Sequence, residues 1–413
     1  MTFPFSIGGF MRTTPPTPRA LAIILVGQSN NRPRGSSRLT GTSSGPMNMP
    51  VGGCASPHWL FDPASGGSNE ENTLHWSDAA TAATYAEEGT IQGPGGGLDL
   101  IGLPSTHVKG YMASVAIGSR NLEVLAGGGP MATTLAIIER FAAFAAADGH
   151  ELDYVFVYHH GEKAVSDATS EAQYYANGMD YCTALQLYAA QAVGRPSYVP
   201  PILFAHHMQM QPVIANAVGI QKAILRLSED VPNAMSIGPS YPYDSESDRI
   251  HQTPLGFVQR GEAYGLRIKR WFEDGDTAPP LKMLTAVRTG ASIAVTFNKN
   301  ITIDGAATFG TNLNTSLAHA TGFEYIDNGS PVQVTNAVAL GSDGVTLTLA
   351  STPSGAGSQV LRIAMQATSA SLVSGASNRS GSQIRRAGYS AASVYDGAFT
   401  HYEWATPQEI VVT

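Results

Sequence analysis

The feature that most constrains the fold of this chain is a series of short apolar runs separated by helical patterns. Residues 21–26 form a continuous apolar run that ends at Gly27, which is typical of a strand buried on both faces. Similar runs occupy residues 122–126, 154–158, 202–205 and 234–238. Apolar side chains recur at helical spacing in residues 134–147, 171–192, 213–227 and 255–272. This alternation predicts an α/β domain of three layers (α/β/α), with a parallel five-stranded sheet between the helices.

One long segment, residues 32–106, has no sustained periodicity and is rich in Gly, Ser, Pro, Thr and Asn. Loops of this length are usually functional or disordered. Because Trp59, Leu60, Phe61 and Trp76 are unusual in disordered segments, we expect an ordered insertion close to the site.

The C-terminal third of the chain has a different period. Ile293, Val295 and Phe297 alternate with small or polar residues, as strand residues do, and Asn328-Gly329 is typical of a tight hairpin turn. The chain of 413 residues also exceeds what one hydrophobic core usually supports. We therefore predict an α/β domain at residues 15–273, a linker at 274–281, and an all-β sandwich at 282–413.

Charge and composition narrow the classes of partner. The formal net charge is −8, and the segment from residue 282 onward is neutral, with seven Lys or Arg and seven Asp or Glu. An acidic chain without a basic run gives no support for binding to nucleic acid or to anionic membranes. No stretch is long and apolar enough to cross a bilayer, and residues 1–10 lack the pattern of a signal peptide. The compartment stays open, with an extracellular or virion-associated protein as one option, and no feature indicates the oligomeric state.

The two cysteines do not define a site. Cys54 and Cys182 are too few for a metal cluster, and Cys182 falls in a helical pattern where a buried, inert thiol is expected. A disulfide between them stays open, since nothing in the spacing argues for it.

Polar residues follow each predicted strand. In a parallel sheet, ligands bind at the edge where the strands end, so these residues are candidates for one site. In chain order they are Gln28, Ser29 and Asn30; Gly128; His159, His160 and Glu162; His206 and His207; and Asp248 with His251.

This set of residues contains what acyl transfer needs. Serine is a weak nucleophile that needs a base and a group to orient that base, and Ser29, His251 and Asp248 supply these three roles. Glycine at a strand end can turn a backbone N–H toward a developing oxyanion, and Gly128 is our choice for that donor.

Residues 27–30 (Gly-Gln-Ser-Asn) after an apolar strand resemble the first block of the SGNH/GDSL hydrolases, in the glutamine variant of the sialate O-acetylesterase-like and carbohydrate esterase family 6-like branch. Residues 248–251 are similar to the last block of that superfamily, an Asp-x-x-His. The resemblance covers residues 20–272 outside the insertion. It implies a flavodoxin-like domain and an esterase that removes O-acetyl groups, most often from carbohydrate, through a Ser29-His251-Asp248 triad without a metal or other cofactor.

The resemblance also implies an oxyanion hole formed by the N–H groups of Ser29 and Gly128 and by a third donor. His160 stands where the family has Asn or Gln, and a neutral imidazole can donate one N–H. Neighbouring residues of a strand point to opposite faces, so only one of His159 and His160 can face the pocket, and both stay open. Substrate contacts are expected from Gln28, Asn30, Glu162 and His207.

Other interpretations rest on the same residues. The two histidine pairs suggest a metal, but each pair can offer one ligand whereas catalytic zinc usually takes three. Glu162 and Asp167 suggest a glycosidase pair, which a complete serine triad makes less favoured. The aromatic residues Trp59, Phe61 and Trp76 and the stretch 241–243 could form sugar-stacking walls or pack in the core. A lipid or aryl ester is the alternative substrate, and an adhesin or phage tail protein that only binds glycan is the alternative class.

Overall fold

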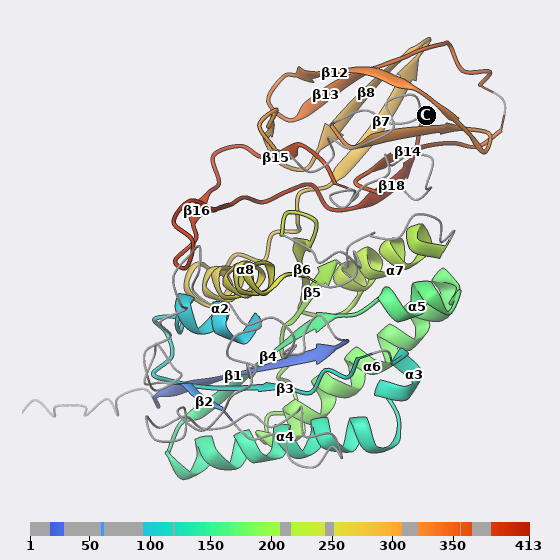
Figure 1. The fold of residues 1–413 in the computed structure, drawn as a ribbon. Helices are drawn as coiled ribbons and strands as arrows, with labels where there is room; N and C mark the ends of the chain where they lie inside the picture. The colour runs from blue at the N-terminus through green and yellow to red at the C-terminus, as the bar shows by residue number, and fades with distance from the viewer. Residues whose placement is uncertain are drawn as a thin grey trace, which may run out of the picture.

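The computed structural model describes residues 17–28, 59–61, 94–118, 120–206, 216–243, 252–307, 321–355, 357–365 and 381–413. These residues form an N-terminal part built around a parallel sheet and a C-terminal part of antiparallel strands (Figure 1). All statements below concern these ranges.

A parallel sheet of six strands forms the centre of the N-terminal part, in the order β2-β3-β1-β4-β5-β6. The strands are β1 (Arg19–Gly27), β2 (Trp59–Phe61), β3 (Lys109–Ser114), β4 (Glu151–His159), β5 (Ile202–His206) and β6 (Ala234–Pro239). Five of these strands correspond in number to the predicted five-stranded sheet. The sixth is β2, a three-residue strand at the edge next to β3. With β2 set aside, the strands lie in the flavodoxin-like order second, first, third, fourth, fifth.

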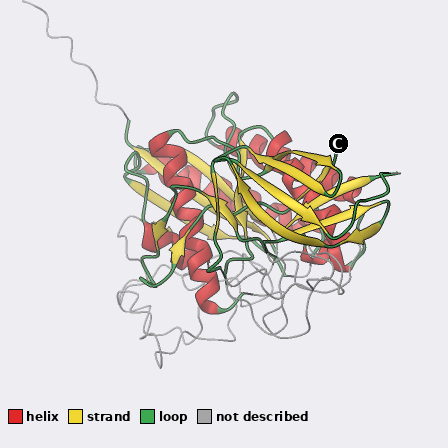
Figure 2. Ribbon diagram, turned by 90° about the horizontal axis from the view of Figure 1, so that it is seen from above, coloured by secondary structure: helices red, strands yellow, loops and turns green. Residues whose placement is uncertain are grey.

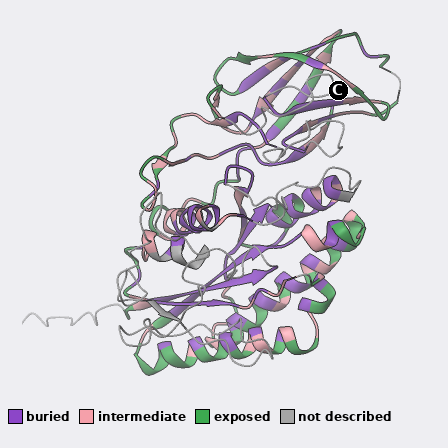
Figure 3. Cartoon of the chain, in the orientation of Figure 1, coloured by how far each residue is buried: buried purple, intermediate pink, exposed green. Residues whose placement is uncertain are grey.

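Helices cover both faces of this sheet, as expected for three layers (Figure 1). The helices α4, α6 and α7 pack in succession on one face, whereas α2 and α8 pack against each other on the other face. The helices are α2 (Pro94–Ile101), α3 (Leu122–Leu125), α4 (Gly128–Ala147), α5 (Glu162–Ser166), α6 (Glu171–Ala192), α7 (Asn216–Asp230) and α8 (Pro254–Asp274). The strands between these layers are almost entirely buried (Figure 3).

The prediction of a strand at residues 122–126 is wrong. Leu122–Leu125 form the helix α3, with Asn121 at its N-cap position, and the second strand of the sheet is Lys109–Ser114. A short and mostly apolar segment fits a short helix with one buried face as well as a strand, and periodicity alone does not separate the two. Gly110 and Ser114 interrupt the apolar pattern of the true strand, which is why the sequence did not reveal it.

The expectation that no stretch is long and apolar enough to cross a bilayer is wrong for helix α4, which alone among the described helices has that length and composition. Its inward face places Ile137, Ile138 and Phe141 in the core, and the carbonyl of Ile138 accepts a hydrogen bond of 2.5 Å from the hydroxyl of Tyr154 on β4. In this structure the long, apolar helix α4 therefore covers one face of the parallel sheet.

The described parts of the insertion at residues 32–106 are β2, α2 and the loop after α2. Helix α2 approaches α8 so closely that a Cβ on Gly97 would lie 2.0 Å from the carbonyl oxygen of Val258. The insertion thus contributes a strand and a helix to the α/β layers, and its other residues lie outside the described ranges.

Two four-stranded antiparallel sheets, β11-β10-β14-β18 and β12-β13-β8-β7, make up most of the C-terminal part. Apolar side chains of both sheets belong to one core cluster, which includes Val295, Phe297, Tyr325, Leu347 and Ile363. The strands are β7 (Met283–Thr289), β8 (Ser292–Phe297), β9 (Ile301–Ile303), β10 (Phe323–Asp327), β11 (Ser330–Val332), β12 (Val334–Leu340), β13 (Gly344–Leu349), β14 (Gln359–Ile363), β15 (Ile384–Arg386), β16 (Ala391–Ala392), β17 (Thr400–His401) and β18 (Gln408–Val411).

The hairpin predicted at Asn328-Gly329 is confirmed. Asp327 pairs with Ser330, and the two residues between them have positive φ angles of 47° and 82°. A two-residue primed turn requires this backbone conformation.

The two parts of the chain meet at the β6 edge of the parallel sheet, with the antiparallel sheets lying over the helices in the view from above (Figure 2). Lys222 on α7 donates to Glu409 on β18 over 3.1 Å. The hydroxyl of Tyr241, just after β6, donates to the carbonyl of Ala405 over 2.9 Å. The seam is therefore made of specific polar contacts.

Gly27 ends β1 at a point where no side chain fits, which makes its replacement a test of the fold. It has a φ angle of +114°, and a Cβ there would lie 2.0 Å from the carbonyl oxygen of His159 on β4. We expect Gly27→Ala to lower the free energy of unfolding by about 2–4 kcal/mol, because backbone atoms must shift.

The control is Gly149→Ala, since Gly149 has a φ angle of +72° and nothing within 4 Å of an added Cβ. It should cost only about 1 kcal/mol from backbone strain. Urea unfolding measures both variants, and equal losses would contradict the close approach of β1 to β4.

Candidate functional site

The candidate site lies where the ends of β1 and β4 meet. The neighbours of β1 are β3 on one side and β4 on the other, so chain connections leave β1 in both directions. At such a switch point the loops diverge and leave a crevice outside the carboxyl ends of the strands. Gly27 and His159 are paired at this point, and Gln28 and His160 are the next residues of their strands.

The side-chain amide of Gln28 joins three loops at this edge. Gln28 is 1% exposed, and its Nε2 donates to the carbonyl of Arg120 over 2.7 Å. Its Oε1 accepts from the backbone N–H groups of Gly161 over 3.3 Å and Lys163 over 3.2 Å. The loops that follow β1, β3 and β4 are thereby fixed to one another. Both ends of the amide are occupied, which makes Gln28 a positioning residue and does not support the expected substrate contact.

His160 is fully buried on the α6 side of the sheet, and both of its ring nitrogens have partners. Nε2 donates to the carbonyl of Arg120 over 2.9 Å, and Nδ1 accepts from the hydroxyl of Tyr174 over 3.1 Å. Burial lowers the pKa of His160 to about 4, so the ring is neutral at pH 7. Its one N–H is therefore used on Arg120, and this geometry does not support His160 as the third oxyanion donor.

His159 points to the opposite side, as strand alternation predicts. Its Nε2 lies 2.9 Å from Oε1 of Glu162, and its Nδ1 lies 3.3 Å from a guanidinium nitrogen of Arg260 on α8. Because a guanidinium only donates, Nδ1 accepts, and Nε2–H donates to the carboxylate. A neutral imidazole thus separates a buried cation from Glu162, which supports a structural role for Glu162 in holding the loop after β4. Arg260 was not among the expected site residues, because it lies inside a helical pattern.

The loop after β3 is the part of the site that the sequence missed. Beyond Ser114 the chain continues alongside β1, where Ile117 N–H donates to the carbonyl of Gly27 over 3.0 Å. Gly118 follows directly, and Arg120 is the residue whose carbonyl accepts from both Gln28 and His160. The loop after β3 therefore contacts the last residue of β1 through the N–H of Ile117. The sequence signal for this loop is Gly118, a glycine soon after a strand. The prediction missed it because it placed the second strand at residues 122–126 in place of Lys109–Ser114.

Gly128 occupies a different place from the one expected. It lies in the first turn of α4 with a φ angle of +53°, and the helix α3 separates it from the loop after β3. It does not follow a strand, so the argument that assigned it an oxyanion role is wrong, and that argument applies to Gly118.

Five of the predicted site residues, Ser29, Asn30, His207, Asp248 and His251, lie outside the described residues. Their described neighbours belong to the same sheet edge. Gln28 precedes Ser29, and His206 is the last residue of β5. Ser240 and Gln252 flank the segment with Asp248 and His251, and the side chain of Gln252 donates to the carbonyl of Ser240 over 3.4 Å. Both ends of that segment therefore meet beyond β6.

The other candidates have structural partners. Asp167 accepts from Lys163 and Asn121, and the hydrogen bond from Lys163 lowers the pKa of its carboxyl, the reverse of what a glycosidase acid needs. Tyr241 is buried against the C-terminal part, which favours packing over sugar stacking. Among the residues that the structure describes, no three His, Cys, Asp or Glu side chains gather as metal ligands. Cys182 is buried in α6, which raises the pKa of its thiol, and Cys54 lies outside the described ranges.

Comparisons with known proteins give structural likenesses only. No protein-family model and no curated protein matches the chain. A solved structure of an Arabidopsis thaliana protein is similar over 61% of this chain and 98% of its own, at 16% identity and a TM-score of 0.41. TesA (11% identity, TM-score 0.30) and the aryl esterase of M. smegmatis (14% identity, TM-score 0.33) each match 60% of this chain and 98% of their own.

The amide of Gln28 can be tested by Gln28→Glu, which keeps the shape of the side chain and removes its donor. A carboxylate oxygen would then face the Arg120 carbonyl, two acceptors without a proton between them. We expect a loss of about 3 kcal/mol in the free energy of unfolding at pH 7. Gln191→Glu, at an exposed position of α6, should change it by less than about 0.5 kcal/mol. Similar values for both variants would refute the role of Gln28.

The buried, neutral His160 predicts a specific acid sensitivity. Its folded pKa of about 4 lies below an unfolded value of about 6.5, so the unfolded chain binds more protons between these values. Stability from this group is fully present above pH 6.5 and is lost as the pH falls toward 4, by about 3 kcal/mol.

His160→Gln, which cannot titrate in this range, removes this component. Urea unfolding of both proteins between pH 7 and pH 4 measures the difference in slope. Parallel curves would show that His160 does not titrate as its burial requires.

Proposed function

We propose that this protein is a serine esterase of the SGNH type, with Ser29 as its nucleophile. The observation that carries the proposal is the buried amide of Gln28, which joins the loops after β1, β3 and β4 at the switch point of the sheet. Ser29 is the next residue in the chain. A nucleophile needs to be held rigidly and to have backbone donors nearby, and this network supplies a rigid support at that edge.

In the proposed mechanism, His251 removes the proton of Ser29 as its hydroxyl attacks the ester carbonyl. Asp248 orients the imidazole and stabilises its cationic form. His251 then protonates the departing alcohol, and water hydrolyses the acyl-enzyme by the reverse sequence. The contact between Ser240 and Gln252 supports this assignment, since it holds both ends of the segment with Asp248 and His251 beyond β6.

The proposed oxyanion donors are the backbone N–H groups of Ser29 and Gly118. Gly118 replaces Gly128 because the loop after β3 hydrogen bonds to the end of β1 through Ile117. His160 and Gln28 act on this hole indirectly, since both donate to the carbonyl of Arg120 and so fix the loop that carries Gly118. This division makes His160 a positioning residue.

For the substrate we propose an O-acetyl or other short-chain acyl ester on a carbohydrate. The support is the glutamine in the first block, which resembles the carbohydrate branch of the superfamily, and the antiparallel C-terminal part, of a kind often attached to polysaccharide-active enzymes. A lipid or aryl ester is the competing substrate class. A protein that only binds glycan is the competing class of function.

Ser29→Ala tests the nucleophile. Removal of the attacking oxygen should lower hydrolysis of p-nitrophenyl acetate by about 10³-fold or more and leave the melting temperature unchanged. Ser351→Ala, at an exposed loop position of the C-terminal part, is the matched control and should keep full activity.

A fluorophosphonate probe separates an esterase from a binding protein, because only an activated serine reacts with it. The native chain should be labelled at Ser29, and absence of labelling would contradict the proposal. Rates on acetylated xylan, acetylated sialic acid and long-chain acyl esters then separate the substrate classes, and a preference for long chains would contradict the carbohydrate assignment.

A further inference from the structure

A cavity of about 50 Å³ lies in the seam between the two parts of the chain. It is bounded by the second half of β6, by α8 and by the segment that includes β17. None of the residues assigned to the proposed triad or oxyanion hole lines it. Its walls include Gly238, Arg267, Arg270, Tyr389, His401 and Glu403.

Two arginines of α8 line one side of the cavity and share one carboxylate. Asp276 accepts from Arg267 over 3.0 Å and also from Arg270. Arg270 lies over the ring of Tyr389, 4.7 Å from its centre. Burial lowers the pKa of Arg267, and the like charge of Arg270 acts in the same direction. Because two guanidinium groups share one carboxylate, this side of the cavity has one positive charge that Asp276 does not balance.

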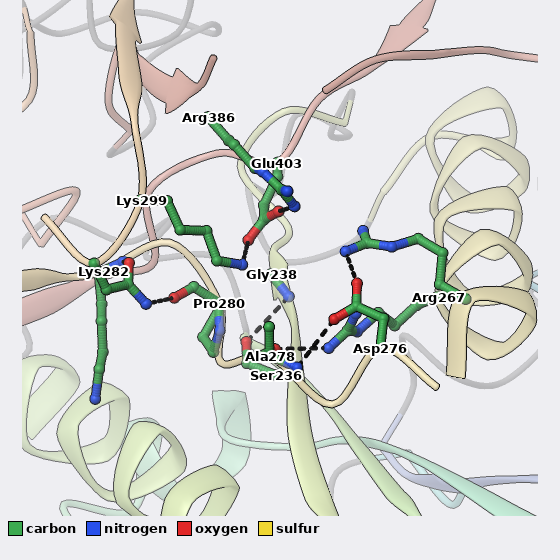
Figure 4. A network of polar contacts seen from close by, with 12 residues as sticks. Ser236, Gly238, Arg267, Asp276, Ala278, Pro280, Lys282, Lys299, Arg386 and Glu403 are labelled. Carbon is green, nitrogen blue, oxygen red and sulfur yellow. Dashed lines mark hydrogen bonds and ion pairs between the residues drawn. The ribbon is translucent and has the colours of Figure 1, made fainter. Parts of the chain in front are cut away.

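The opposite side of the cavity repeats this arrangement. Glu403 accepts from Lys299 and, over 3.0 Å, from Arg386. Figure 4 shows Arg267 and Asp276 on one side of Gly238 and the group around Glu403 on the other side. Within these two groups, four cations share two carboxylates, and the buried carboxylate of Glu262 beside His401 lowers the net charge around the cavity to +1.

His401 adds a polar atom that has no partner among the described residues. Its ring is 4% exposed, and its Nε2 donates to the buried carboxylate of Glu262 over 2.9 Å. Its Nδ1 is buried without a hydrogen bond in the described part of the chain. Buried polar atoms are nearly always satisfied. With the proton on Nε2, Nδ1 is an acceptor, so it calls for a donor such as water or a hydroxyl of the ligand.

Size and charge define the ligand. A water needs roughly 10–15 Å³ by this measure, so the cavity accommodates a group of a few non-hydrogen atoms and no complete sugar ring. Guanidinium groups match the oxygens of carboxylates and phosphates, with charge-assisted hydrogen bonds. We propose that the seam is a binding site for a small oxyanion, either inorganic phosphate or the carboxylate of an acidic sugar, held between α8 and the C-terminal part.

The test is binding of inorganic phosphate and of glucuronate to the full chain, measured by calorimetry and by thermal unfolding against chloride at equal ionic strength. Calorimetry should show saturable binding, and a ligand that binds only the folded state should raise the melting temperature progressively once its concentration exceeds Kd. Tighter binding of phosphate assigns the site to phosphate, and tighter binding of glucuronate assigns it to carboxylates. The Ser29→Ala protein should bind equally well, so the result does not depend on the proposed esterase.

Arg270→Gln should weaken binding about tenfold, because it removes a charge-assisted hydrogen bond donor. Arg386→Gln, at a side chain 35% exposed and so more tolerant of change, is the second variant and should weaken binding several-fold through the lost charge. Arg226→Gln on α7 is the charge-matched control, because Arg226 is 49% exposed and pairs with Glu171 away from the cavity. No saturable binding of either anion, or equal weakening by Arg226→Gln, would overturn the proposal.

Discussion

The candidate site depends on one buried side-chain amide. A primary amide carries donors on one end and an acceptor on the other, so Gln28 can satisfy the carbonyl of Arg120 and two backbone N–H groups of the loop after β4 at once. A carboxylate in its place could only accept, and an apolar residue would remove the acceptor of the N–H groups of Gly161 and Lys163 and one of the two donors to the carbonyl of Arg120. Because buried groups left unpaired are costly, the three loops are held in one arrangement.

Two adjacent histidines extend this arrangement to both faces of the sheet. His160 lies toward α6 and, through Tyr174 and Tyr158, joins a chain of buried hydrogen bonds. His159 lies toward α8, between Arg260 and Glu162. The loop after β4 is therefore supported from both helical layers, and the N–H of each ring is committed to a protein acceptor. That rigidity is what preorganised electrostatic stabilisation of an oxyanion requires.

Sequence patterns predicted much of this fold for a physical reason. Helix α6 and strands β1, β4 and β5 have long or uniformly apolar patterns, because both faces of a central strand and one face of a covering helix must be buried. The second strand failed as a prediction because Gly110 and Ser114 break its apolar run, whereas the apolar α3 imitates a strand. That one error also underlies the choice of Gly128 as an oxyanion donor, since Gly128 follows α3 and not a strand.

The sequence by itself determined the alternation of strands and helices, the change to antiparallel strands after residue 282, and the polar residues at strand ends. These properties follow from local periodicity and from where burial must begin and end. Only the tertiary structure decided that Gln28 contacts residues 92 to 135 positions away, that both rings of His159 and His160 are occupied, and that four cations meet at a seam. Such contacts depend on strand order and on the packing of two parts of the chain, and no short stretch of sequence encodes either.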